Sequence, residues 1–64
     1  MTNKEIKALA HLMAKELETE QNLHVRDGIL RVKYAVEEMV TADSFENWSV
    51  FNRVWRAEMD KPVA

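Results

Sequence analysis

The stretch from Leu23 to Tyr34, LHVRDGILRVKY, holds the only glycine of the chain and decides which fold class the sequence can adopt. Asp27-Gly28 lies between alternating apolar and polar residues, which is the pattern of a β-hairpin with a two-residue turn. The stretch also belongs to an apolar series at helical spacing, made of Val25, Ile29, Val32, Val36 and Val40. The residues therefore allow two local structures, and the surrounding chain has to decide between them.

The helix is the better interpretation of this stretch. A two-stranded ribbon is only marginally stable alone and would need both flanking segments packed over it. A helix with one interior glycine costs about 1 kcal/mol relative to alanine and keeps the whole valine series in phase. One Gly and one Pro in the chain also argue against a turn-rich all-β design. The alternative is an α+β fold with a ribbon over residues 23–34 that turns at Asp27-Gly28.

A first helix is predicted over residues 3–20. Thr2 and Glu5 form a capping-box pattern at its start. Its core face consists of Ile6, Leu9, Ala10, Met13 and Leu17. Three glutamates crowd its carboxyl end, where the helix dipole disfavours negative charge, so this end should fray or find Arg26 or Arg31 nearby. A phase break of roughly 140° between this series and the next places the end of the helix at Gln21-Asn22.

Two further helices complete the predicted fold. The second begins at residue 23, or at residue 27 with Asp27 as its cap, and runs to 41. The third spans 44–60, with Asp43 or Ser44 as its cap and Lys61-Pro62 as its stop. Its core face is expected to be Phe45, Trp48, Phe51, Trp55 and Met59. The sequence therefore predicts an all-α three-helix bundle, one domain over residues 1–64.

No arrangement of reactive side chains predicts a catalytic, cofactor or metal site. Glu20 and His24 have a spacing that suits two metal ligands, but the predicted helix break separates them and no second pair completes a site. His11 lies between Lys7 and Lys15 and is expected to be an ordinary exposed histidine. The chain has no cysteine nucleophile and no glycine-rich phosphate loop. We therefore expect no enzyme activity and no cofactor.

The charges and apolar runs narrow the possible partners. The net charge of −2 is spread evenly, so no segment has the basic excess that binding to phosphates requires. No apolar run approaches the roughly 18 residues of a membrane span, and no secretory segment follows the charged start. The cysteine-free composition gives no sign of an oxidising compartment. A cytoplasmic protein without a membrane partner is expected.

A second set of apolar residues lies off the three core faces and is the predicted partner-binding set: Leu12, Leu30, Tyr34, Val50 and Val54. Each helix of a three-helix monomer has room for one inward face, and a chain of 64 residues is short of core. The leftover residues favour a homodimer that also binds an unidentified protein. The predicted function is a small, non-enzymatic protein-interaction regulator, of a kind that suits a bacterial or phage-like setting.

The alternative function is a helix-turn-helix transcriptional regulator. The short connection over residues 41–44 could join two crossing helices, and Ser44, Asn47 and Ser49 would supply polar groups early in a recognition helix. Glu46 would then face phosphates, and the net charge is negative. Nucleic acid is therefore the less favoured partner.

Overall fold

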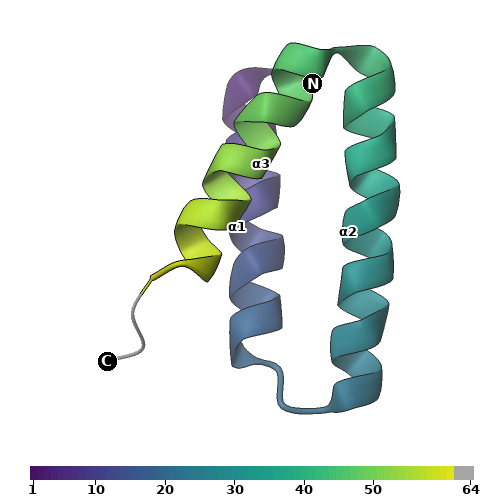
Figure 1. Cartoon of the computed structure of the whole chain (residues 1–64), viewed down its shortest axis with the longest axis vertical. Helices are drawn as coiled ribbons and strands as arrows, with labels where there is room; N and C mark the ends of the chain where they lie inside the picture. The colour runs from purple at the N-terminus through teal and green to yellow at the C-terminus, as the bar shows by residue number, and fades with distance from the viewer. Residues whose placement is uncertain (62–64) are drawn as a thin grey trace.

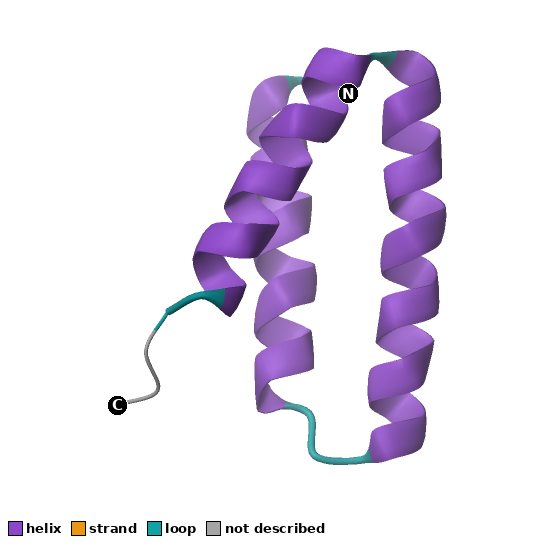
Figure 2. Cartoon of the chain, viewed as in Figure 1, coloured by secondary structure: helices purple, strands orange, loops and turns teal. Residues whose placement is uncertain are grey.

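Three helices make up most of the computed structural model, which describes residues 1–61 (Figure 1, Figure 2). They are α1 (Asn3–Thr19), α2 (Leu23–Asp43) and α3 (Phe45–Met59). The described residues contain no strand, and Gly28 lies inside α2 without a positive φ. The three-helix prediction is confirmed and the ribbon alternative is wrong. The proline of the predicted stop, Pro62, lies outside the described residues.

Side-chain caps set where each helix begins. The Thr2 hydroxyl accepts from the Glu5 N–H at 3.2 Å, and the Glu5 carboxylate accepts from the Thr2 N–H at 3.1 Å, which confirms the capping box. The Asn22 side chain accepts from the N–H groups of His24 and Val25, so α2 begins at 23 rather than at 27. The Ser44 hydroxyl caps α3. With caps at 22 and 44, the connections between the helices are very short. Because α2 begins at residue 23, Gly28 lies in the interior of that helix.

Arg26 closes the carboxyl end of α1. One guanidinium nitrogen of Arg26 donates to the carbonyl oxygen of Leu17 and to that of Glu20, the latter at 3.0 Å. A cation at this position satisfies carbonyls that have no partner within the helix and opposes the negative end of the helix dipole. Of the two outcomes expected for this end of the helix, the structure shows the pairing with Arg26.

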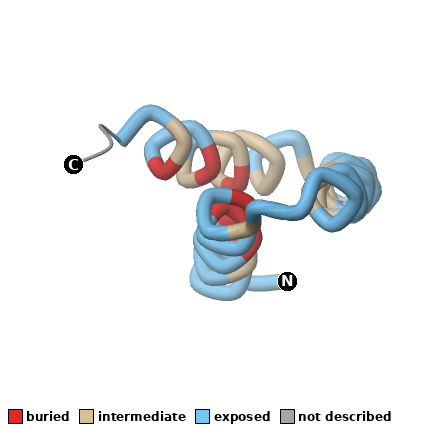
Figure 3. Tube along the Cα trace, turned by 90° about the horizontal axis from the view of Figure 1, so that it is seen from below, coloured by how far each residue is buried: buried red, intermediate tan, exposed pale blue. Residues whose placement is uncertain are grey.

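The core lies mainly between α1 and α3, as the buried segments in Figure 3 show. Its fully buried large side chains are Ile6 of α1 and Phe51 of α3. The buried hydrophobic residues are Ile6, Ala10, Met13, Ala14, Leu17, Val40, Phe51 and Trp55. Val40 is the single member from α2. Four of the five residues predicted for the core face of the first helix are buried, and Leu9 is half-buried against them.

Two valines predicted for the core face of the second helix are exposed instead. The exposed fraction is 46% for Val25 and 57% for Val32, whereas Ile29 and Val36 of the same series are half-buried. The reason lies in the helix arrangement, because α3 starts beside the carboxyl end of α2 and diverges from it as it crosses α1 (Figure 1). One edge of the amino-terminal half of α2 is therefore left without a covering helix.

Phe45 is a second correction, since it was predicted on the core face of the third helix and is 71% exposed. It is the first residue of α3, directly after the tight connection at Ser44, and its ring lies over Trp48 with the centroids 5.4 Å apart. Phe51 and Trp55 are buried as predicted, and Trp48 and Met59 are half-buried against the core. Within residues 1–61, none of the helices has the length and hydropathy of a membrane-spanning segment.

Candidate interaction surface

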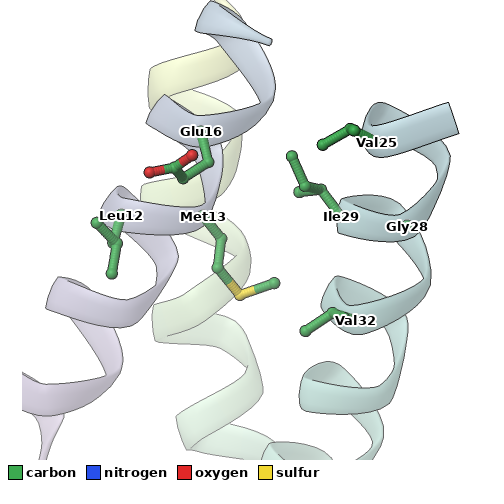
Figure 4. Close-up of a pocket in the computed structure, with 7 residues that line it drawn as sticks. All are labelled: Leu12, Met13, Glu16, Val25, Gly28, Ile29 and Val32. Carbon is green, nitrogen blue, oxygen red and sulfur yellow. The ribbon is translucent and has the colours of Figure 1, made fainter. Parts of the chain in front are cut away.

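An apolar groove runs between α1 and α2 near the loop that joins them (Figure 4). Its volume is about 500 Å³. It is lined by Leu12, Met13 and Glu16 from α1 and by Val25, Gly28, Ile29 and Val32 from α2. Glu16 is the only charged residue among them. The groove therefore suits an apolar side chain rather than a charged ligand.

The walls of the groove expose large apolar side chains to water. Leu12 is 59% exposed on the α1 wall, and Val25 and Val32 form much of the α2 wall. Figure 4 shows the side chains of Val25, Ile29 and Val32 pointing from α2 toward α1. Covering apolar surface is worth roughly 25 cal/mol per Å², so filling this groove is favourable. Its position fits a protein-docking surface.

The exposed apolar residues continue along α2 beyond the groove. We call this surface the outer face of α2, and it consists of Val25, Gly28, Val32, Ala35, Met39 and Ala42. All six are exposed, Met39 to 73%. They form two interleaved series with a period of seven residues, which is the spacing that aligns one helix face with a neighbouring helix. The outer face thus continues the exposed apolar residues of the groove along α2.

The structure separates the residues of the predicted partner-binding set. Leu12 lies in the groove, and none of the other four lines it. Tyr34 is 60% exposed elsewhere on α2, with the Lys33 ammonium 5.1 Å from its ring centre. The remaining members, Leu30, Val50 and Val54, are half-buried against the core. Their roles in binding stay predictions.

Sequence reasoning missed the main residues of the outer face. It assigned Val25 and Val32 to the core and treated Gly28 only as a question of turn or helix. The signal that could have found the face is the exact recurrence of apolar residues at 25, 32 and 39, with small residues three positions after each. One apolar series in α2 repeats every seven residues, and another, the predicted core face, repeats at spacings of three and four. Two such series indicate two apolar sides on one helix.

A polar pair occupies part of the contact between α2 and α3. The side chain of Lys33 is 11% exposed, and its ammonium lies 4.7 Å from the ring centre of Trp55. The same ammonium pairs with Glu37, one turn along α2. Cation–π and ionic contacts offset part of the cost of burying these charges, but they bury less apolar surface than aliphatic side chains would. The hydrophobic contact between the inner side of α2 and α3 is therefore weak.

Glu58 is a buried acidic residue on the contact between α3 and α1. It is 6% exposed, and one carboxylate oxygen lies 2.8 Å from the Lys61 ammonium and 2.8 Å from His11 Nδ1. Its other oxygen is 3.9 Å from the Lys15 ammonium. The hydrogen bond from Lys61, together with the nearby positive charges, lowers the pKa of the Glu58 carboxyl below its ordinary value. The cluster attaches the end of α3 to the middle of α1.

This cluster also changes the interpretation of His11. The histidine is exposed over about half of its surface, as predicted, but it pairs with Glu58 as well as lying between two lysines. Nothing in the local sequence around Glu58 indicates its burial. Within residues 1–61, no group of three or more His, Cys, Asp or Glu side chains is placed to hold a metal ion.

The polar residues considered for DNA contact are partly engaged within the chain. The Ser44 hydroxyl caps α3, and the side-chain amide of Asn47 donates to the Asp43 carboxylate at 2.9 Å. Ser49 is half-buried. The helix-turn-helix function stays a prediction that these contacts do not favour.

Two local arrangements therefore stand out: the apolar surface formed by the groove and the outer face of α2, and the charged cluster around Glu58. The first is open to water, and the second is occupied by the chain's own cations. The apolar surface is the better candidate for binding. Comparison of the chain with protein-family models, with curated proteins and with solved structures gave no match.

Proposed function

We propose that the protein is a non-enzymatic, cytoplasmic interaction module that self-associates through the groove and the outer face of α2. The observation that supports this most strongly is the exposure of Leu12 and Val32 in the groove and of Met39 farther along the same face of α2. Scattered exposed apolar residues are common, but a groove continued by a periodic helix face is typical of an interaction site.

The size of the chain favours the same function. A domain of 64 residues buries a small fraction of its surface and has little hydrophobic core to spare. Val40 is the only buried residue of α2, although that helix has 21 residues. Covering its outer face with protein would add the burial that the monomer lacks. The dimer would still expose Tyr34 and Phe45, which could contact a further protein partner.

Sedimentation equilibrium tests the proposal directly. The chain should sediment with a mass of about 15 kDa, twice the 7.5 kDa of one copy. Val32→Glu places a charge on the outer face and should give a folded monomer, because an unpaired charge in an apolar interface is costly. Tyr34→Glu is the matched control, since Tyr34 is exposed to nearly the same extent, and this variant should stay dimeric.

Circular dichroism of both variants shows whether they remain helical, so a lost dimer cannot be confused with a lost fold. A wild-type chain that remains monomeric up to about 1 mM, where even a weak complex of about −4 kcal/mol is populated, would refute self-association. A folded Val32→Glu variant that still forms dimers would show that another surface mediates the association.

A further inference from the structure

We propose that two copies of the chain pair antiparallel along the outer faces of their α2 helices, so that Met39 of the partner subunit enters the groove over Gly28. This rests on the self-association proposed above and specifies its geometry. The two-fold arrangement uses the same surface on both copies and closes on itself. It therefore gives a dimer and no larger assembly.

The sizes of the side chains favour the antiparallel direction. The larger residues of the outer face are Val25, Val32 and Met39, and each is followed three positions later by a small residue. In an antiparallel pair, each large residue meets a small residue of the partner. The opposed positions are 25 with 42, 28 with 39 and 32 with 35. A parallel pair would instead place large against large and small against small, which leaves gaps between crowded layers.

The groove supplies the space that this pairing needs. A Cβ placed on Gly28 would have no atom within 4 Å, so the surface is open at this position. Val25 and Val32 border the opening on α2, and Leu12 lies on the opposite wall. Met39 is the most exposed large residue of the outer face and has a flexible, apolar side chain suited to an irregular space. In the antiparallel register, it is the residue that reaches Gly28 of the other copy.

The charges beside the outer face are also complementary in this direction. Arg31 and Glu38 flank the face on the same side of α2, one in each half of the helix. Antiparallel pairing brings Arg31 of one copy near Glu38 of the partner subunit, and symmetry repeats the contact. The Arg31 guanidinium also lies 3.0 Å from the Asp27 carboxylate of its own helix. Both side chains are exposed, so Arg31 can contact Asp27 and the partner's Glu38 at the same time. Parallel pairing does not bring these opposite charges together.

Disulfide trapping tests the register, because the chain contains no cysteine of its own. Gly28→Cys and Met39→Cys are made as separate single variants and oxidised alone and as an equal mixture. In the proposed register, residues 28 and 39 of different copies face each other, and the mixture should give the mixed 28–39 disulfide. Two copies of residue 28 lie about 16 Å apart along the helices, beyond the roughly 7 Å that a disulfide spans. Either variant alone should therefore remain largely uncrosslinked.

Tyr34→Cys serves as the control, and it should form no disulfide with either variant above the level of random collision. Efficient crosslinking of Gly28→Cys and Met39→Cys each with itself would overturn the antiparallel register in favour of a parallel one. A dimer that gives no disulfide in any combination would refute this interface while leaving self-association intact. A monomeric mass for the reduced variants and the wild type would instead refute the self-association on which the register rests.

Charge exchange gives a second test that needs no crosslinking. Arg31→Glu and Glu38→Arg should each raise the dimer dissociation constant by about fivefold, a typical scale for losing exposed ion pairs. The double variant should restore most of the affinity, because both copies carry both substitutions and Glu at position 31 then faces Arg at position 38 of the partner subunit. A double variant with the summed loss of the two single variants would refute the proposed contact.

Discussion

The contact of α1 with α3 and the contact of α2 with the rest of the chain are built differently. Five residues of α1 and three of α3 are buried, and the fully buried Ile6 and Phe51 lie in this part of the molecule. α2 is the longest helix but buries only Val40, and its contact with α3 includes the charged Lys33. The first contact is a hydrophobic core with the charged Glu58 near the end of α3, whereas the second buries only one residue of α2.

This difference shows how a small chain can divide its apolar residues. The inner side of α2 contributes half-buried residues to the core, while its outer face remains in water. A helix in a protein is stabilised mainly by packing rather than by its own propensity. For α2, the packing within one copy is limited, and a second copy is the source of packing that we propose. In this arrangement, folding of α1 and α3 and association of α2 depend on different sets of residues.

The largest expected effect separates these two sets. Phe51→Ala should destabilise the fold by about 3–5 kcal/mol, because it removes a fully buried aromatic side chain and leaves a cavity. That loss is comparable to the whole stability that a core of this size supplies, so the variant should be largely unfolded at room temperature. Thermal unfolding followed by circular dichroism would measure the effect.

Val32→Ala is the contrasting change on α2. It should alter the stability of the monomer by no more than about 0.5 kcal/mol, since the side chain is mostly exposed, while weakening the dimer. Equal losses of monomer stability for Phe51→Ala and Val32→Ala would contradict the division between core and outer face.

The sequence predicts the core face of α1 well because the apolar residues of that face have a single role. Ile6, Ala10, Met13 and Leu17 share one face, and that face is buried against the rest of the bundle. The capping box at Thr2 and Glu5 is equally local, since both partners are within one turn of each other. Local periodicity and local hydrogen bonds are visible in the sequence without knowledge of the packing.

The prediction was less complete where a residue's role depends on a neighbouring helix. The valine series correctly indicates that α2 is a helix, but Val25 and Val32 lie at the edge that α3 leaves uncovered. Glu58 looks like an ordinary charge near a helix end, and it is buried because α3 crosses α1 beside His11. The spacing within α2 can indicate a second apolar side, but it does not show how α3 crosses α1 or which edge of α2 that crossing leaves uncovered.

A smaller effect, of opposite sign, is expected at Gly28. Gly28→Ala should raise the stability of the monomer by up to about 1 kcal/mol, because alanine favours the helix and the added methyl group meets no neighbouring atom. Chemical denaturation in the Val32→Glu background would measure this change without a contribution from association. The gain should come from α2, the helix with the least burial.

Ala35→Gly is the matched control, because Ala35 is exposed on the same helix and the reverse substitution should lower stability by a similar amount. A clear loss of stability for Gly28→Ala would mean that position 28 needs a backbone conformation other than the helical one.

The smallest expected effect concerns pH and tests the contact between α3 and α1. The pKa of the Glu58 carboxyl is lowered in the folded chain, chiefly by its hydrogen bond with Lys61, from an ordinary value of 4.5. Its contribution to stability is therefore present above pH 4.5 and is lost as the pH falls through the lower pKa of the folded state. Because Lys61, His11 and Lys15 are each at least half exposed, solvent screens these contacts and keeps the effect modest.

Thermal midpoints measured from about pH 6 to about pH 3 should fall for the wild type and fall less steeply for Glu58→Gln. Glu5→Gln is the control, because the pKa of Glu5 is also lowered, by its hydrogen bonds with Thr2, but Glu5 lies at the start of α1 and not on α3. If the profile of Glu58→Gln followed that of the wild type over this range, the cluster would not couple α3 to α1, and the apolar core alone would hold the two helices together.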